Sequence, residues 1–354
     1  MSQETAASVL LTGARGYIGT VLGPVLLDAG FAVTGLDNGL FDDCTFGVQP
    51  AQPPFDRLDV RDITPKHLVG YDAVVHLAGL CNDPMGSLNP ALTAAINLDA
   101  TLQLARMARE VGVRRFIFAS SCSLYGAGGE DLVTEDSPLQ PLTPYAESKA
   151  RSEEGLSALA DDEFSPVYMR NATVYGASPR LRADLVLNNL VGWAVATTRV
   201  RLLSDGRAWR PLLHVRDLAS ACLALLTAPA GVVHDRAFNI GRVDGNVLIR
   251  DLANRVGELL PGTEVEISAD ASADSRSYRV DFGRMTREVP AYRPEWDVTT
   301  GIIEMAAFYR SAGLSLEQFT GGGLNRVTRL HELIAANAVG DDLRPRDLAP
   351  VARP

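Results

Sequence analysis

The sequence predicts an α/β fold in which a parallel sheet is covered by helices on both of its faces. Short apolar segments alternate with segments of helical periodicity along the first half of the chain. The apolar segments lack the polar–apolar alternation of a strand with one solvated face, so both of their faces are expected to be buried. Glycine, proline and polar residues bound each segment, which is typical of strands joined by loops and crossover helices.

Each predicted element rests on a local signal. The strands are short apolar runs, the helices carry apolar residues at every third or fourth position, and the one long loop is rich in proline and glycine. No internal repeat interrupts the order. In chain order the sequence predicts strand 8–12, helix 17–29, strand 31–37, loop 38–55, strand 73–77, helix 89–110 and strand 115–119.

The regular alternation loosens in the second half of the chain, which predicts a smaller domain interleaved with the first. Two later segments again have the pattern of a helix and a strand and are expected to return to the sheet. The end of the chain is largely polar, with one helical patch, and is expected to lie on the surface. We assign 1–176 and 211–241 to the sheet domain, 177–210 and 242–325 to a smaller C-terminal substrate domain, and 326–354 to a C-terminal tail.

Composition excludes several classes of function. The chain has 354 residues, of which 46% are hydrophobic and 21% charged, as in ordinary globular proteins. A net charge of −10 argues against nucleic-acid and anionic-membrane partners. Its four cysteines lack CxxC spacing, so neither a metal site nor a disulfide scaffold is expected. The sequence shows no targeting pattern and no long apolar run, so we expect a cytoplasmic protein.

A glycine-rich turn joins the first strand to the first helix. Such a turn lets backbone N–H groups approach a diphosphate, and the helix N-terminus adds its dipole. The second strand ends in Asp37, followed by Asn38. An acidic side chain at this point can bind the ribose 2′-hydroxyl and repels a 2′-phosphate, so the pattern predicts a dinucleotide site that prefers NAD to NADP. The residues of the turn are Gly13, Arg15, Gly16, Tyr17, Ile18 and Gly19.

A Tyr-x-x-x-Lys pair, Tyr145 and Lys149, lies near the middle of the chain. Positions i and i+4 of a helix share one face, so the ammonium group is expected beside the phenol. A nearby positive charge lowers a tyrosine pKa that is ordinarily about 10. The pair is common by chance on solvated helix faces and gains its meaning from the dinucleotide motif. Together they indicate a proton acceptor for an alcohol.

The combined motifs resemble those of the extended short-chain dehydrogenases/reductases, in the nucleotide-sugar epimerase/dehydratase family. The glycine spacing is the family's fingerprint, and Tyr145 and Lys149 match its catalytic pair. The segment ending in Tyr125-Gly126 is similar to the one that carries a catalytic serine or threonine, which places Ser121 in that role. The resemblance covers roughly residues 8–310. It implies a Rossmann-type doubly wound sheet, an NAD cofactor and a nucleotide-diphosphate sugar substrate.

The resemblance also implies cofactor contacts outside the glycine turn. In the family an Asp-Val dipeptide contacts the adenine, and a Leu-Ala-Gly loop runs beneath the cofactor. An asparagine in the next helix holds the backbone near the site, a structural rather than catalytic role. The implied residues are Asp59, Val60, Leu77, Ala78, Gly79 and Asn97, together with Tyr145 and Lys149.

Substrate contacts follow from the same resemblance. Arg210 begins an Arg-x-x-x-His-Val-x-Asp segment whose arginine holds the substrate diphosphate in the family. A second arginine is expected there, with Arg276 and Arg279 both open choices. His214 is expected to pack or hydrogen-bond rather than to catalyse. The other implied substrate-binding residues are Asn82, Ser121, Thr173, Asp184 and Asn188.

The residues after Ser121 narrow the choice among the reactions that the resemblance implies. Family members that eliminate water, and those that decarboxylate uronic acid sugars, commonly carry an acidic residue there, whereas this chain has Cys122 and Ser123. The resemblance, with this departure, implies a nucleotide-sugar 4-epimerase that acts through a transient 4-keto sugar. A nucleotide-4-ketosugar reductase is the alternative, and a dehydratase or a non-catalytic dinucleotide sensor is less favoured. By analogy with the family we expect a homodimer.

Overall fold

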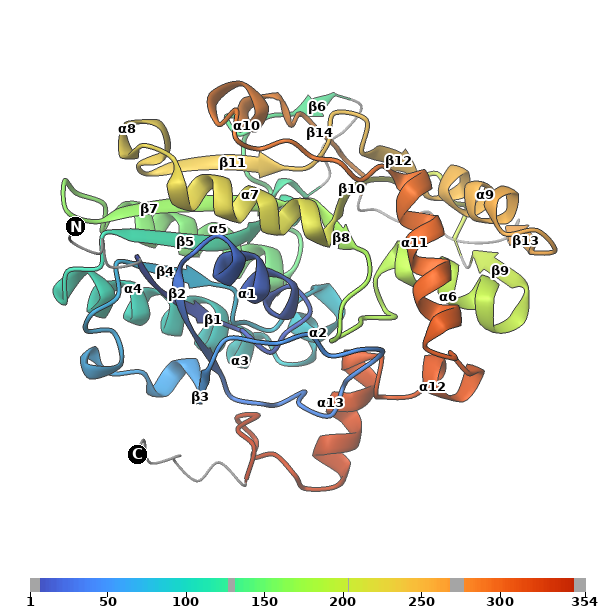
Figure 1. Cartoon of the computed structure of the whole chain (residues 1–354), viewed down its shortest axis with the longest axis horizontal. Helices are drawn as coiled ribbons and strands as arrows, with labels where there is room; N and C mark the ends of the chain where they lie inside the picture. Colours follow the sequence, from blue (N-terminus) through green and yellow to red (C-terminus); the bar gives the residue numbers. More distant parts are fainter. Residues whose placement is uncertain (1–6, 127–130, 203, 268–276, 347–354) are drawn as a thin grey trace.

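The structure, a computed structural model, describes residues 7–126, 131–202, 204–267 and 277–346. Its centre is a seven-stranded sheet in the order β11-β7-β5-β4-β1-β2-β3, and every neighbouring pair is parallel (Figure 1). The predicted parallel α/β architecture is thereby confirmed. The strands are β1 (Ser8–Thr12), β2 (Ala32–Asp37), β3 (Phe55–Arg57), β4 (Ala73–His76), β5 (Arg115–Ser121), β7 (Ser165–Asn171) and β11 (Arg236–Ile240).

Helices cover both faces of this sheet because successive strand residues point into two different apolar cores. In β1, Val9 and Leu11 join one core, whereas Leu10 between them joins the other. Burial on both sides explains why the central strands β1 and β4 are largely apolar. The covering helices are α1 (Gly19–Asp28) and α7 (Val215–Thr227) on the near face in Figure 1, and α4 (Ala100–Glu110) and α5 (Pro144–Ser157) on the far face.

Two details of the sheet domain differ from the sequence analysis. The helix predicted over 89–110 is interrupted, because α3 (Pro90–Ala94) leads into a π-helical turn, Ala95–Asp99, before α4 begins. The side chain of Asn97 in this turn bonds the backbone of another loop, and such a long-range contact leaves no local signal. The loop predicted over 38–55 ends in β3, which is too short and too polar to be recognised as a strand.

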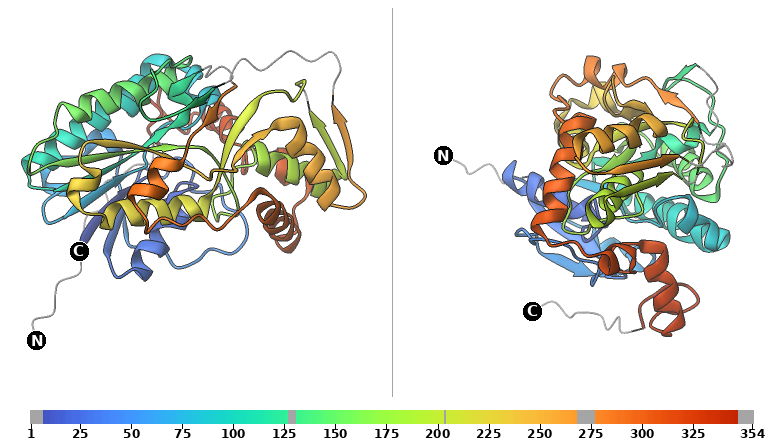
Figure 2. Two further views of the ribbon diagram at one scale, coloured as in Figure 1. Left: turned by 90° about the horizontal axis from the view of Figure 1, so that it is seen from above. Right: turned by 90° about the vertical axis from the view of Figure 1, so that its right-hand side faces the viewer.

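A smaller lobe lies beside the carboxyl ends of the sheet strands (Figure 2) and has its own apolar core. The chain enters it after β7, returns to the large sheet in α7 and β11, and then enters it again, so the two lobes are interleaved. The smaller lobe contains β8 (Thr173–Tyr175), α6 (Val186–Thr197), β9 (Arg199–Leu202), β10 (Trp209–His214), β12 (Asn246–Leu248), α9 (Ile249–Leu259), β13 (Glu264–Ile267) and α11 (Val298–Ser311).

Short elements complete the described chain. Strands β6 and β14 pair in parallel, and α13 lies beside α2 (Figures 1 and 2). None of the helices in the described ranges is long and apolar enough to cross a membrane. The short elements are β6 (Leu132–Val133), β14 (Arg279–Val280), α2 (Asp83–Leu88), α8 (Ala230–Val233), α10 (Gly283–Glu288), α12 (Leu316–Thr320), α13 (Arg326–Ala335) and single helical turns at Val60–Asp62, Pro65–His67 and Cys122–Tyr125.

A buried ion pair fixes α5 to the sheet. Glu153 of α5 lies 2.7 Å from Arg170 of β7, and the two side chains are only 7% and 8% exposed. Ser120 donates a hydrogen bond to the same carboxylate, and Arg170 donates one to the Tyr125 hydroxyl at 3.0 Å. Removing one partner of such a pair leaves an uncompensated buried charge, at a cost of roughly 3–5 kcal/mol. The network therefore holds α5, and the residues it carries, in one position.

His76 at the end of β4 is buried between β1 and α4. The hydroxyl oxygens of Thr12 and Thr101 lie 2.7 Å and 2.8 Å from its two ring nitrogens. Burial lowers the pKa of His76 to about 3, and the positive charge of Lys149 adds to this effect. The ring is therefore neutral in the folded protein at neutral pH.

We expect acid to destabilise the fold through His76. Below its ordinary pKa of about 6.5 the histidine of the unfolded chain gains a proton, whereas the folded ring stays neutral until about pH 3. Between about pH 6.5 and pH 5 this difference costs about 2 kcal/mol of unfolding free energy. His76→Gln should abolish that part of the pH dependence, as measured by urea unfolding at about pH 7 and pH 5. The same loss of stability in both proteins would contradict the prediction.

Candidate active site

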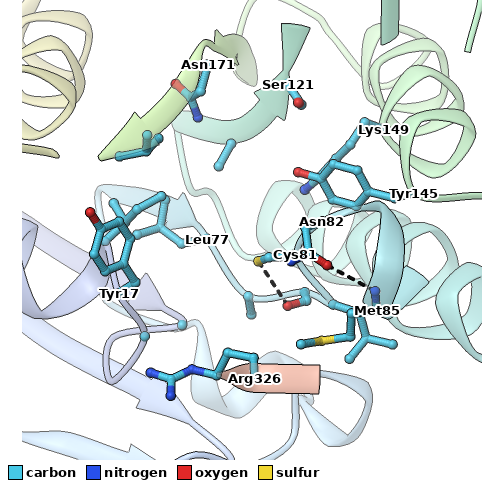
Figure 3. A pocket seen from close by; sticks show the side chains of 18 of the residues that line it. Tyr17, Leu77, Cys81, Asn82, Met85, Ser121, Tyr145, Lys149, Asn171 and Arg326 are labelled. Atoms are coloured by element: carbon cyan, nitrogen blue, oxygen red, sulfur yellow. Dashed lines mark hydrogen bonds between the residues drawn. The ribbon is translucent and has the colours of Figure 1, made fainter. Parts of the chain in front are cut away.

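A cavity of about 500 Å³ lies at the carboxyl ends of β1, β2, β4, β5 and β7, between the two lobes. This edge of a doubly wound sheet, where the strand order reverses between β1 and β4, is the usual ligand site of the fold. Figure 3 shows the side chains of α5, the loop after β4 and the C-terminal helix converging on it. The cavity therefore brings together residues that lie far apart in the sequence.

The glycine turn forms one end of the cavity. Gly13 has a φ of +70°, and a Cβ added there would lie 2.8 Å from the backbone nitrogen of Ala78. A Cβ at Gly19, where α1 begins, would lie 2.8 Å from backbone carbons of Ala14. Only glycine fits at these two positions. The turn is thus packed against the loop after β4, and its N–H groups and the α1 dipole suit the diphosphate of a dinucleotide.

The carboxylate of Asp37 lies beside this turn, where the adenosine ribose of a dinucleotide would lie. It accepts hydrogen bonds from the backbone N–H of Gly39 at 2.9 Å and of Arg15 at 3.1 Å. Burial raises the pKa of Asp37, although these two N–H groups act in the opposite direction. The glycine cradle and this carboxylate fit the predicted NAD. The other cavity-lining residues predicted to hold the cofactor are Gly16, Tyr17, Ile18, Asn38, Asp59, Val60, Leu77, Ala78 and Gly79.

Two residues predicted to bind the cofactor do not line the cavity. The Arg15 side chain stacks 4.5 Å above the Phe55 ring and pairs with Asp42. Its backbone N–H contributes to the site by donating a hydrogen bond to Asp37. Asn97 is buried and exchanges hydrogen bonds with the backbone of Leu80, at 2.7 Å from the N–H and 3.0 Å to the carbonyl. Asn97 therefore positions the loop beneath the cofactor site, as expected of a structural residue.

Ser121, Tyr145 and Lys149 meet at the other end of the cavity. Thr143 caps α5 by accepting the N–H of Ala146 at 3.2 Å, and Tyr145 lies in the first turn of this helix. The Lys149 ammonium lies 4.5 Å from the Phe118 ring centre and 5.8 Å from that of Tyr145. Ser121 ends β5, and Figure 3 shows all three side chains facing the same space. The arrangement suits proton transfer to or from an alcohol bound between them.

The pKa of Tyr145 corrects one expectation. Burial and the neighbouring Cys81 raise this pKa above its ordinary value, and the hydrogen bond with Ser121 lowers it only in part. We expected Lys149 to lower it, but burial lowers the pKa of Lys149 itself to about 8. In the chain alone Tyr145 is therefore a protonated phenol. The positive charge of NAD⁺, which we also expected to act on Tyr145, would favour its phenolate.

A polar cluster that the sequence analysis only partly identified faces the same space. The Asp184 carboxylate accepts hydrogen bonds from Asn82 at 2.8 Å and from Nε of Arg182 at 3.1 Å. Burial alone would raise the pKa of Asp184, but Arg182 outweighs it, so this pKa is lowered and the carboxylate stays ionised. Asn82 and Asp184 were predicted as substrate-binding residues, whereas Arg182 was not. Its ion-pair partner Asp184 lies only two residues later, a spacing too common to mark a site in the sequence.

The other predicted substrate residues lie in different places. Thr173 and Arg210 line the cavity. Asn188 does not, because its amide accepts the Gly176 N–H at 3.0 Å and donates to the Arg182 carbonyl at 3.1 Å, so assigning it to the substrate was wrong. Arg276 lies outside the described residues. The competing choice, Arg279, stacks 5.4 Å from the ring centre of Trp209.

His214 has the packing role that the sequence analysis expected. Its ring stacks on Trp296 at 4.2 Å, and its Nε2 lies 2.9 Å from a Glu304 carboxylate oxygen. Within the described ranges, no three His, Cys, Asp or Glu side chains are grouped as a metal ion requires. Several cavity-lining residues were not predicted from the sequence, among them Asn171, Arg182, Tyr278, Arg326 and Leu343.

Comparisons with known proteins agree with this geometry. The model described as the NAD dependent epimerase/dehydratase family matches residues 9–241. UDP-glucose 4-epimerase of Azospirillum brasilense is 31% identical over 350 residues, covering 91% of this chain and 97% of that protein. dTDP-glucose 4,6-dehydratase of Streptomyces griseus is 30% identical over 319 residues, covering 85% and 93%. A solved dTDP-glucose 4,6-dehydratase from Streptomyces venezuelae, with NAD bound, has a TM-score of 0.75 at 25% identity, covering 88% and 99%.

The raised pKa predicts when Tyr145 ionises. In protein stripped of dinucleotide, wild type and Tyr145→Phe should show the same alkaline tyrosinate absorbance up to about pH 10, since Tyr145 stays protonated. Adding NAD⁺ should produce a Tyr145-dependent ionisation at lower pH, because a nearby positive charge favours the phenolate. Ultraviolet difference titration of the two proteins measures both effects. Ionisation of Tyr145 near neutral pH in the stripped protein would contradict the prediction.

Proposed function

Because the chain belongs to the NAD-dependent epimerase/dehydratase family, we propose that it is a nucleotide-sugar 4-epimerase that keeps its NAD bound between turnovers. Family membership confirms the predicted extended short-chain dehydrogenase/reductase family, the Rossmann-type fold and NAD as the cofactor. The similar proteins include both epimerases and dehydratases, so the reaction must be argued from the residues of the site.

The surroundings of Ser121 carry this proposal. Loss of water from a sugar needs an acid that can protonate the departing hydroxyl. Cys122 is fully buried, its thiol faces the Arg170 carbonyl at 3.1 Å, and burial raises its pKa. Ser123 lines the cavity but has no acidic proton to give. Asp184, held ionised by Arg182, has none either. These residues favour epimerisation over dehydration.

The side chains suggest how a 4-hydroxyl would be handled. The Tyr145 oxygen, as phenolate, takes the proton from the C4 hydroxyl, and Ser121 donates a hydrogen bond to the same sugar oxygen. Bound NAD supplies the acceptor, and then the donor, of the hydride at C4. After the 4-keto sugar has rotated in the cavity, the Tyr145 oxygen returns the proton to the oxygen at C4. Lys149 keeps a positive charge beside the phenolate, and Arg210 holds the substrate diphosphate during the turn.

The reaction can be tested with purified protein and a panel of UDP- and dTDP-hexoses without added reductant. We expect products of unchanged mass with inverted C4, identified by NMR, and NAD released on denaturing the protein. Tyr145→Phe should lower the rate about 10²- to 10⁴-fold, the usual contribution of a general base, with NAD content unchanged. A product lighter by one water would instead identify a dehydratase. Turnover only with added NADH or NADPH would identify a 4-ketosugar reductase.

Arg210 provides a second test, directed at substrate binding. Arg210→Leu should weaken binding of UDP or dTDP about 10- to 100-fold, because a guanidinium–phosphate contact is a charge-assisted hydrogen bond. Arg207→Leu, a change at an exposed residue outside the cavity, is the matched control. Isothermal titration of each protein with the nucleoside diphosphates measures the effect. Equal affinities in the two variants would remove Arg210 from the diphosphate site.

We also expect a homodimer, on the basis of family resemblance. Extended members of the family pair through the helix that carries the Tyr-x-x-x-Lys motif and the helix before the fifth strand. These correspond here to α5 and α4. Light scattering of the purified protein would measure the assembly.

A further inference from the structure

The C-terminal segment, residues 326–346, closes one side of the cavity. It lies outside the family match, which ends at residue 241. Arg326, the first residue of α13, and Leu343 both line the cavity. The segment is held in place by an apolar core that it shares with the loop and helices after β4. Its members are Leu80, Met85, Ile96, Leu330, Val339 and Leu343.

Polar contacts tie the same segment to the adenosine end of the cavity. Arg61, next to the predicted adenine contacts Asp59 and Val60, donates a hydrogen bond to the Asp342 carbonyl at 2.8 Å. Arg344 pairs with Asp62 at 2.8 Å. The segment therefore contacts both the residues predicted to bind adenosine and the loop after β4.

The guanidinium of Arg326 is buried with few direct polar partners. Its side chain is only 4% exposed, its Nη2 donates to the Arg180 carbonyl at 3.1 Å, and Nη1 has no hydrogen-bond partner. Within the described ranges no carboxylate forms an ion pair with it. Burial lowers the pKa of Arg326, and the positive charge of Arg182 acts in the same direction, whereas Cys44 and the Asp184 carboxylate act against it without outweighing burial. A buried cation in this state is costly unless an anion joins it.

Arg326 lies beside the loop that follows Asp37, and Arg182 and Asp184 of the polar cluster also act on it electrostatically. Its guanidinium carbon is 5.1 Å from the ring centre of Phe41, in the loop that follows Asp37. It lines the same cavity as Gly13 and Gly16, and Figure 3 shows it beside the loop that carries Cys81. Arg210, the candidate for the substrate diphosphate, comes instead from β10 of the smaller lobe.

We infer that Arg326 binds the diphosphate of the dinucleotide, opposite the glycine turn, and that the C-terminal segment is a third wall of the cofactor site. The glycine turn supplies neutral N–H donors, whereas Arg326 supplies a full positive charge and N–H donors suited to phosphate oxygens. Binding the diphosphate would also provide the anion that this buried guanidinium lacks. The inference rests on NAD as cofactor and is independent of whether the enzyme is an epimerase.

Arg326→Leu, Arg326→Lys and the control Arg329→Ala test the inference. Arg329 lies one turn later on α13, pairs with Asp43 and Glu332, and does not line the cavity. The NAD content of each purified protein is measured by chromatography after denaturation. Isothermal titration of the stripped proteins then gives their affinities for NAD and, separately, for UDP. Thermal unfolding without ligand shows whether each variant is folded.

Arg326→Leu should weaken NAD binding about 10- to 100-fold and leave UDP binding unchanged. Arg326→Lys, which keeps the charge but loses the planar donor group, should weaken NAD binding less, and Arg329→Ala should not change it. If Arg326→Leu does not fold, the comparison of Arg326→Lys with wild type decides, and equal NAD affinity would overturn the inference. An unchanged NAD affinity in folded Arg326→Leu would overturn it too. Weaker UDP binding with normal NAD binding would assign Arg326 to the substrate diphosphate and likewise overturn it.

Discussion

The parallel pairing of β1, β4 and β5 is the constraint on which the site depends. Parallel register places Thr12, His76 and Phe118 side by side, so these strands reach the same edge of the sheet. The residues at the strand ends, from the glycine turn after β1 to Ser121 at the end of β5, therefore line one cavity. The close contact between Gly13 and Ala78 then fixes the distance between the ends of β1 and β4. A bulkier residue at the turn would separate the parts of the site before it altered any of their chemistry.

Charged side chains of both signs line the cavity at this edge. The carboxylates are Asp37, Asp59, Asp83 and Asp184. Of the cavity-lining cations Lys149, Arg182 and Arg326, only Arg182 forms an ion pair with a carboxylate within the described ranges. Buried cations without such a partner favour anionic ligands, although the protein as a whole carries a net charge of −10. A bound cation would make the raised pKa of Tyr145 compatible with a role as a base. The pKa of the Tyr145 phenol would thus suit the site with NAD⁺ bound, and the chain without cofactor lacks that positive charge.

The sheet, the glycine turn and the Ser121, Tyr145 and Lys149 set were predictable because each has a signal within a few residues of sequence. Apolar runs identify strands buried on both faces, and the spacing along α5 places two side chains on one face. The structural role of Asn188 was not predictable, since its amide is hydrogen-bonded to backbone groups of two other segments. The break at Ala95–Asp99 was missed for the same reason, because Asn97 in this turn contacts a distant loop. Arg182 was missed although its ion-pair partner Asp184 lies only two residues away.

The C-terminal residues show the limit of composition as a guide. A polar segment with one helical patch is typical of a surface tail, and nothing in its composition indicates that Arg326 is buried. Its burial follows from Leu330, Val339 and Leu343, which are apolar residues too widely spaced to form a strong pattern. Their partners, Leu80 and Met85, lie some 250 residues earlier in the chain.

The interleaving of the two lobes has an evolutionary consequence. Because the chain leaves the large sheet after β7, returns in α7 and β11 and leaves again, neither lobe is one continuous stretch of sequence. Exchange of a single gene segment therefore cannot transplant the smaller lobe intact. The residues of this lobe that line the cavity come from β8, the segment before α6 and β10, so a change of ligand preference would need substitutions scattered along the sequence.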